Sequence, residues 1–312
     1  GNFELLHKRY DINFLYPVIG CVKYKDRLLS NMTRLVYKNI DFVIASLKKK
    51  YSDSEKEQMK TRMSQVYWHM IRNESSNYKY AESDYTIQGN KYGRLFSTSS
   101  VQGLSRRIRN TIVDKENCVD IDMVNAHPSL LIQLAQTLDV AMPTLNQYVL
   151  HRGTYIDELV RKYSLTRDDA KKVTISVLNG ARRSGMYPDM VWIKEIECEI
   201  QVISDALKKT AAGIEIVRDI SRDAKWNEKG SLVNHCLCKM ENEILSSCVR
   251  YLESRNIEIY TLCFDGLIAS RTDSSILEEL SWHVFSELGL RVEFDFKSFD
   301  EDLGSEVIEA LL

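Results

Sequence analysis

A tight antiparallel hairpin is the strongest structural constraint in this sequence. Two apolar runs, residues 257–263 and 267–270, flank Phe264-Asp265-Gly266. An Asp-Gly step between apolar runs is typical of a hairpin, because these residues accept the positive φ angles that short turns need. Asp265 is therefore expected in the turn between two strands.

A second aspartate, Asp122, is expected at the end of another strand. Residues 118–122 alternate polar and apolar side chains as a strand does, and an apolar helix is expected over residues 128–136. Taken singly, Asp122 is also explained as a strand-end cap and Asp265 as a turn residue. Asp120 lies two residues before Asp122 on the same strand face, so it is a further candidate for the same role.

The two aspartates are expected to share a metal site. If both strands lie in one antiparallel sheet, the carboxylates of Asp122 and Asp265 come together, and two such acids repel each other unless a cation neutralises them. Mg²⁺ favours carboxylate and phosphate oxygens, and Mn²⁺ is a possible substitute. Two ions would stabilise both the attacking and the leaving oxygen of an in-line displacement. The pattern thus indicates phosphoryl transfer.

A basic helix is predicted between the two aspartates in the sequence. Side chains recur every four residues along one face of residues 167–180, namely Arg167, Lys171, Ile175 and Asn179. Two cations one turn apart would grip a triphosphate and neutralise charge on the leaving pyrophosphate. The alternative is a solvated face on which the cations pair with Asp168 and Asp169.

Ordered segments of the chain resemble the polymerase region of family A DNA polymerases, the bacterial DNA polymerase I family. The resemblance covers about residues 85–300, and motif B is its most specific part. Residues 93–97 and Gln102 resemble the family's G-R-L-S-S stretch and the L-Q that follows it, and residues 106–109 resemble its R-R-I-R. Residues 122–127 resemble motif A, written D-Y-S-Q-I-E. Further along the chain, residues 167–180 resemble motif B (R-x3-K-x7-Y-G), and residues 264–266 resemble motif C (H-D-E).

This resemblance implies a role for each matched residue. Asp122 and Asp265 would hold the metal ions. Nucleotide contacts would come from Arg167 and Lys171 on the phosphates, Ile175 on the base and sugar, Gly180 beside the template base, and His127 and Asn179 near the sugar. Contacts with the primer–template duplex would come from Arg94, Gln102, Arg106 and Arg107.

Departures from the family pattern affect the expected chemistry. His127 replaces the Glu that screens the sugar 2′ position, and Asn179 replaces its Tyr partner, so the choice between dNTPs and rNTPs stays open. A bulky His could still act as the gate. Gly266 replaces the last carboxylate of motif C, as a small residue does in related single-subunit RNA polymerases. Cys238 stands about where a Gln is expected on the helix that tracks the minor groove.

The formal net charge of −2 is unusual for a protein that binds nucleic acid. Because acidic residues dominate elsewhere, one basic cleft on an acidic body is expected. Its candidate residues are clustered as Arg106, Arg107 and Arg109, as Arg167, Lys171 and Lys172, and as Arg182 and Arg183.

Composition bounds the location of the protein. No apolar run approaches the roughly 18 to 20 residues that span a bilayer, and no signal peptide is found. Seven cysteines without paired metal-ligand spacing favour reduced, structural thiols. A soluble, intracellular protein is expected, in the host cytoplasm if it is viral. The first residue is Gly1, which suggests a processed product, so N-terminal domains or replication partners could lie outside the chain.

The expected fold is α+β, a right-hand polymerase with an antiparallel palm sheet, helical fingers and a helical thumb. Residues 1–85 would form the N-terminal region and thumb, 86–138 the palm with motif A, 139–235 the fingers with motif B, and 236–312 the palm with motif C. Helices are predicted within residues 27–72 and over 155–163, 167–178, 191–209, 232–253 and 275–288, and a last strand over 291–299.

The predicted function is template-directed DNA synthesis. The chain would add dNTPs to a primer 3′ end, release pyrophosphate and lack proofreading, because its length leaves no room for an exonuclease domain. A single-subunit RNA polymerase or primase using rNTPs is one rival, favoured by His127 and Asn179. An inactive hand serving as a nucleic-acid-binding scaffold is another, although both aspartates are retained. A two-metal nuclease is a third, but it gives no reason for the basic helix.

Overall fold

The structure is a computed structural model that describes residues 9–47, 51–72, 78–87, 94–220 and 228–312. Its two antiparallel sheets and many helices agree with the α+β class. No helix among the described residues combines the length and apolar character needed to cross a membrane. The boundaries of palm, fingers and thumb stay predictions.

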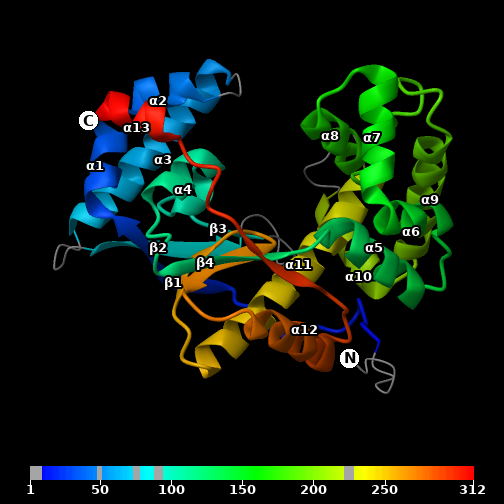
Figure 1. The fold of residues 1–312 in the computed structure, drawn as a ribbon. Coiled ribbons are helices and arrows are strands. Elements are labelled where there is room, and N and C mark those ends of the chain that lie inside the picture. The colour runs from blue at the N-terminus through cyan, green and yellow to red at the C-terminus, as the bar shows by residue number, and fades with distance from the viewer. Residues whose placement is uncertain (1–8, 48–50, 73–77, 88–93, 221–227) are drawn as a thin grey trace.

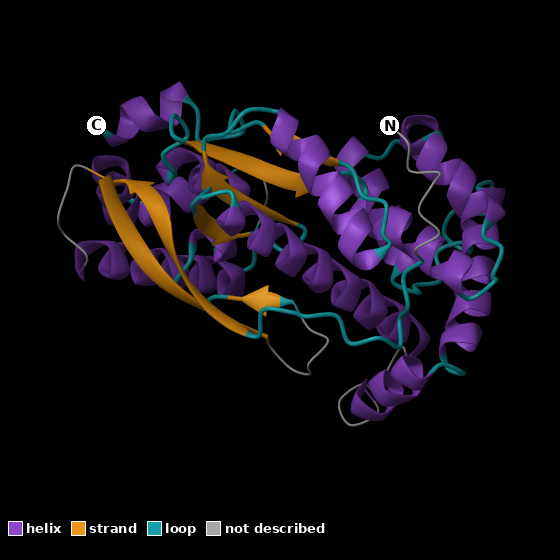
Figure 2. Cartoon of the chain, turned by 90° about the horizontal axis from the view of Figure 1, so that it is seen from below, coloured by secondary structure: helices purple, strands orange, loops and turns teal. Residues whose placement is uncertain are grey.

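An N-terminal sheet that the sequence pattern does not predict has the order β1 (Cys21–Leu29), β2 (Tyr78–Ile87) and β3 (Leu95–Phe96). β1 and β2 form a long twisted ribbon (Figure 2). The sequence pattern did not predict β1 because the strand is rich in charged residues. Only the alternate side chains of Tyr24, Asp26 and Leu28 are buried, and one of these is itself an aspartate. Residues 27–29 of the predicted helical region are therefore strand, and the helices begin at Ser30.

The described residues between β1 and β2 form the helices α1 (Ser30–Lys38), α2 (Ile40–Ser46) and α3 (Asp53–Arg72). Ser52 and Glu55 form a capping box at the start of α3, since the Glu55 N–H donates to the Ser52 hydroxyl at 3.3 Å and the Ser52 N–H donates to the Glu55 carboxylate at 2.7 Å. Val36 and Met63 are fully buried in the core that these helices share.

The second sheet holds the predicted palm strands. Its order is β5 (Ile259–Leu262), β6 (Gly266–Ser270), β4 (Cys118–Met123) and β7 (Phe294–Lys297), and every pairing is antiparallel. The prediction that the Asp122 strand and the Asp265 hairpin share one antiparallel sheet is thereby confirmed. Asp122 pairs with Gly266 on one side and with Asp295 on the other.

Two groups of helices lie on opposite sides of this sheet (Figure 1). α4 (Arg106–Ile112) and α13 (Ser305–Leu311) lie with the N-terminal helices. The other group comprises α5 (Ala126–Thr137), α6 (Pro143–Leu150), α7 (Arg152–Tyr163), α8 (Arg167–Leu178), α9 (Val191–Leu207) and α10 (Ala211–Ile220). The helix predicted over residues 191–209 is present as α9, which ends at Leu207. α10 was not predicted, and the Thr210 hydroxyl accepts a hydrogen bond from the Gly213 N–H in its first turn.

The long helix α11 (Glu228–Ser254) packs against α9, α10 and α12 (Ser275–Leu288). Two hydrophobic clusters border the four-stranded sheet. Ile121 and Leu267 are cross-strand partners in the cluster that includes α5 to α11, whereas Cys118 and Ile268 belong to the cluster of the N-terminal helices. Since side chains alternate along β4, Asp122 lies on the same face as Cys118.

Candidate active site

The turn between β5 and β6 places Asp265 next to β4. Cys263 and Gly266 close the turn, since each N–H donates to the other's carbonyl, at 2.7 and 3.2 Å. The Met123 N–H donates to the Asp265 carbonyl at 3.0 Å, which ties the turn to the end of β4 beside Asp122. The predicted hairpin is therefore present, and it brings the two aspartates together.

The conformation of this turn differs from the expectation in one respect. Phe264, not Gly266, has a positive φ, of 62°. Such a backbone is uncommon for a bulky residue and is typically maintained by surrounding contacts at functional sites. The Phe264 ring packs edge-on against Phe96, with ring centroids 5.3 Å apart, and lies 5.4 Å from the Arg94 guanidinium. These contacts hold Asp265 in place.

The carboxylates of this site are crowded and partly buried. Burial, followed by the charge of Asp265, raises the pKa of Asp122 to about 6, while the ion pair with Lys297 opposes the rise. Burial also raises the pKa of Asp265, as does the charge of Glu241. Asp120 has a raised pKa because of burial, although Arg109 and Lys297 lower it. The site therefore favours a cation among its carboxylates.

Asp122 and Asp265 fit a Mg²⁺ or Mn²⁺ site. The Lys297 ammonium already contacts the Asp122 carboxylate, which shows that a positive charge is accepted at this point. Carboxylate oxygens are hard ligands, and Mg²⁺ is usually held by one or two carboxylates together with substrate phosphates. The two aspartates could hold the metal in this way.

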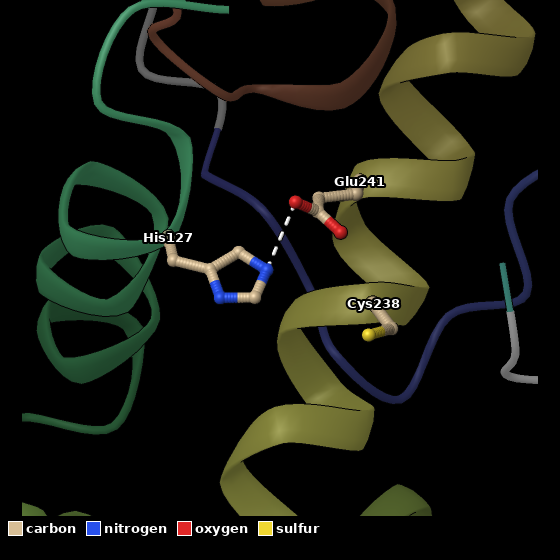
Figure 3. Close-up of side chains that lie close together, drawn as sticks. All are labelled: His127, Cys238 and Glu241. Carbon is tan, nitrogen blue, oxygen red and sulfur yellow. Dashed lines mark ion pairs between the residues drawn. The ribbon is translucent and has the colours of Figure 1, made fainter. Parts of the chain in front are cut away.

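His127 lies on the first turn of α5 and faces α11. Its Nε2 is 2.9 Å from Glu241 Oε1 (Figure 3). The same nitrogen is 2.9 Å from Arg94 Nη2. Cys238 lies one turn before Glu241, and these three residues are the only group of at least three potential metal ligands within mutual reach in the described part of the chain. Arg94 and His127, two predicted site residues, are thus brought into direct contact.

The predicted basic helix is α8. The Thr166 hydroxyl caps it by accepting from the Asp169 N–H at 3.1 Å. Lys171 lies 3.6 Å from Asp168, as the alternative interpretation expected, whereas Arg167 forms its ion pair with Asp157 of α7, which that interpretation did not include. The two basic side chains remain 55% and 41% exposed and can still meet a ligand.

The rest of the predicted motif B lies at the end of this helix. Ile175 is 49% exposed, so its side chain is available to a ligand. Asn179 caps the C-terminus of α8, and its side-chain oxygen accepts from Asn234 of α11 at 2.8 Å. Gly180 has a φ of 76°, a value that other residues rarely adopt.

Three predicted nucleic-acid contacts have internal partners. Gln102 is buried and donates to the carbonyls of Leu95 and Leu262, at 3.0 and 2.8 Å, so it joins the two sheets. Arg107 donates to the carbonyls of residues 302 and 303, and Arg106 lies 3.6 Å from the Glu301 carboxylate. In this structure these residues hold neighbouring segments in position.

Lys297 and Glu241 are features of the site that the sequence pattern did not reveal. Lys297 ends the short strand β7, and only the pairing of β7 with β4 brings it to Asp122. Glu241 is one of several buried polar residues in the middle of α11, with Lys239, Asn242 and Glu243. The run of charged residues among the apolar residues of this helix is the signal that could have marked it, although Lys239 and Glu243 of the same run pair with each other.

Comparison with known proteins supports a polymerase-like fold. No protein family model matches the sequence. The chain is 23% identical over 229 residues to the putative helicase V13 of Sputnik virophage, and the match covers 69% of this chain but only 29% of that protein. Among solved structures, it is similar to the POL domain of Pol1 from M. smegmatis in complex with DNA primer–template and dNTP. The TM-score is 0.53 at 12% sequence identity, over 89% of this chain and 68% of that chain.

Proposed function

We propose that this chain is a template-directed DNA polymerase that adds dNTPs to a primer 3′ end by two-metal phosphoryl transfer. The observation that carries the proposal is the position of Asp122 and Asp265 at adjoining ends of β4 and the β5–β6 turn, within a polymerase-like fold. The similar Pol1 domain was solved in complex with a primer–template and a dNTP, which supports these substrate classes. No proofreading domain is part of the proposal.

The side chains divide the work of the reaction. Asp122 and Asp265 would hold Mg²⁺, which, when bound, polarises the transferred phosphate and lowers the pKa of the attacking hydroxyl. Arg167 and Lys171 would neutralise the triphosphate as pyrophosphate leaves, since their exposed ammonium and guanidinium groups are one helical turn apart. Arg94 would contact the primer–template from the same side as His127.

A direct test is primer extension with and without Mg²⁺, on DNA and RNA templates. We expect Mg²⁺-dependent extension, and we expect Asp122→Asn and Asp265→Asn to lower it by at least about 1,000-fold, because several kcal/mol of transition-state stabilisation are lost. Asp273→Asn is the matched control, since Asp273 is an exposed aspartate before the start of α12 that accepts a hydrogen bond from the Ser275 N–H. Extension that survives Asp265→Asn would exclude the two-metal assignment and favour the scaffold alternative.

A second candidate function is RNA synthesis or priming with rNTPs. This candidate is based on His127 and Asn179, which stand where family A DNA polymerases have a Glu and a Tyr. Both side chains contact polar residues of α11. Parallel extension with dNTPs and rNTPs separates the two candidates. A large preference for rNTPs would replace the first proposal with the second.

The virophage relative supports a place in replication. It is named a putative helicase, yet this chain covers 29% of its length. The present sequence has no Gly-Lys step, which the phosphate-binding loop of P-loop ATPases requires, so such a loop does not carry the similarity. We therefore propose that the polymerase hand works beside a helicase, whether on the same polypeptide or as a partner.

A further inference from the structure

A cluster of polar side chains joins α5 and α11 (Figure 3). Arg94, the residue before β3, contacts members of this cluster on both helices. Glu241 is at its centre and is almost completely buried. Its Oε2 accepts from Arg94 Nε and Nη2, at 2.7 and 2.6 Å, and its Oε1 lies 2.9 Å from His127 Nε2. Both oxygens of the carboxylate are therefore engaged by residues of the proposed active site.

The same cluster has the composition of a transition-metal site, with His127, Cys238 and Glu241 atoms within 4.8 Å of one another. Its geometry favours a different use. The Arg94 guanidinium already supplies the cation, and a metal ion would have to displace it. A metal ion would also have to displace the proton of the Cys238 thiol, and burial, which raises the pKa of this thiol to about 11, opposes that loss.

Glu241 is ionised in spite of its burial. Burial alone would raise its pKa, but hydrogen bonding to His127 and the charges of His127 and Arg94 outweigh that effect and lower it. A buried carboxylate with two such partners is stabilising only while the partners stay in place. The carboxylate thus fixes two side chains from different parts of the sequence.

Arg94 connects this buried carboxylate to the turn that carries Asp265. Its guanidinium lies 5.4 Å from the ring of Phe264, the residue next to Asp265. The side chain is still 28% exposed. One part of Arg94 is therefore anchored on Glu241 while another part can be reached by a substrate.

We propose that Glu241 is a positioning residue that holds Arg94, together with His127, in the orientation that meets the primer terminus and the incoming nucleotide. This inference rests on the proposed polymerase function. If the charge of Glu241 is removed, the Arg94 guanidinium loses its buried counterion and is expected to turn toward solvent. A displaced guanidinium would contact the substrate poorly even though Asp122 and Asp265 are untouched.

The test is a double-mutant cycle on single-nucleotide primer extension, with kcat and KM measured separately. We expect Glu241→Gln to lower kcat about 10- to 100-fold, as misplacement of a substrate-contacting group does. Arg94→Ala should have an effect at least as large. If Glu241 acts through Arg94, the variant with both changes is no slower than Arg94→Ala alone.

Glu243→Gln is the matched control. Glu243 lies two residues further along α11, is equally buried, and also forms an ion pair, at 2.7 Å with Lys239. Its replacement should lower thermal stability as Glu241→Gln does, but leave kcat within about 2-fold of the parent protein. This comparison separates the loss of a buried ion pair from the loss of Arg94 positioning.

Three results would overturn the inference. The first is a kcat for Glu241→Gln that matches Glu243→Gln. The second is an additive effect of Glu241→Gln in the Arg94→Ala background. The third is one equivalent of tightly bound zinc in the purified protein that is lost in Cys238→Ser, which would identify a metal site. If the unaltered protein extends no primer, the proposed function fails. The inference about Glu241 is then tested by primer–template binding, measured by fluorescence anisotropy, in which Glu241→Gln and Arg94→Ala should weaken binding in the same non-additive way.

Discussion

Gly266 lies so close to Asp122 that no side chain fits between them. A Cβ atom on residue 266 would be 2.4 Å from the Ile121 carbonyl oxygen and 3.0 Å from Asp122 Oδ1. Atoms do not approach so closely, so β4 or the β5–β6 turn would have to move. The glycine therefore lets the two aspartates of the proposed metal site approach each other.

The first prediction follows from this contact. We expect Gly266→Ala to reduce primer extension by at least about 100-fold, because displacement of reacting groups by about 1 Å has costs of that size. Gly153→Ala is the control, since nothing lies within 4 Å of a Cβ there, and it should stabilise α7 by up to about 1 kcal/mol. Steady-state extension and thermal unfolding of both variants check the prediction. Parent-like activity of Gly266→Ala would contradict the close packing.

The second prediction concerns Lys297, whose ammonium group forms an ion pair with the Asp122 carboxylate. A metal ion must compete with this ammonium for the same oxygens. We expect Lys297→Met to lower the Mg²⁺ concentration for half-maximal extension about 3- to 10-fold. This change corresponds to the roughly 1 kcal/mol of an ion pair that Mg²⁺ would no longer have to displace. The measurement is a Mg²⁺ titration at constant ionic strength.

Lys115→Met controls for the general loss of a charge in this titration. Lys115 pairs with Asp302 at 3.1 Å, and neither residue contacts the aspartates of the site. Its replacement should leave the Mg²⁺ dependence unchanged. An increased Mg²⁺ requirement in Lys297→Met would instead mean that the lysine supports the active arrangement of Asp122.

Local patterns were sufficient to predict the central part of the site. The strand that ends at Asp122, the hairpin at Asp265 and the helix that starts at Arg167 each depend on a few neighbouring residues, and each is present in the structure. The reason for Gly266 was different from the expected one, because its role is close packing on β4 and not a positive φ. Such packing depends on another strand and cannot be derived from the turn itself.

Long-range pairings account for what the sequence did not predict. β1 has charged residues at alternate positions. Its alternation of inward-facing and outward-facing side chains becomes visible only when the buried Asp26 is counted as inward-facing. Lys297 and Glu241 reach the site through strand pairing and helix packing over more than a hundred residues. No local pattern specifies which acid or base will lie opposite another.

The third prediction concerns Asp26, a fully buried aspartate whose carboxylate accepts hydrogen bonds from Thr261, Ser100 and the Val101 N–H. Burial raises its pKa to about 7, although these hydrogen bonds oppose the rise. The folded protein therefore keeps a proton that the unfolded chain releases above about pH 4. Through Asp26, the free energy of unfolding falls by about 1.4 kcal/mol per pH unit as pH rises from about 4 to 7, up to roughly 4 kcal/mol.

Asp26→Asn mimics the protonated acid and should remove this dependence. The amide NH₂ can donate to the Thr261 and Ser100 hydroxyls while the amide oxygen accepts from Val101. Urea unfolding at pH 5 and pH 7.5 gives the comparison, and the variant should gain stability relative to the parent protein as pH rises. Parallel profiles for the two proteins would show that Asp26 is ionised in the folded state.

The fourth prediction compares two adjacent lysines on α8. Lys171 lies on the face with Arg167 and Ile175, whereas Lys172 is one position further around the helix. Lys171 is partly exposed and Lys172 is exposed, and each has an aspartate three residues earlier as its neighbour, Asp168 and Asp169 respectively, so removal of either should have a small effect on stability. A difference between them in catalysis therefore depends on the helix face alone.

We expect Lys171→Ala to lower kcat/KM for the incoming nucleotide about 10- to 100-fold, because a charge-assisted contact with the leaving phosphates is lost. Lys172→Ala should stay within about 2-fold of the parent protein. Nucleotide titrations on one primer–template under single-turnover conditions separate binding from chemistry. Equal effects of the two substitutions would favour a solvated basic face over a triphosphate site. A nonspecific positive field acts through either lysine, whereas a bound triphosphate distinguishes between positions about 100° apart around the helix.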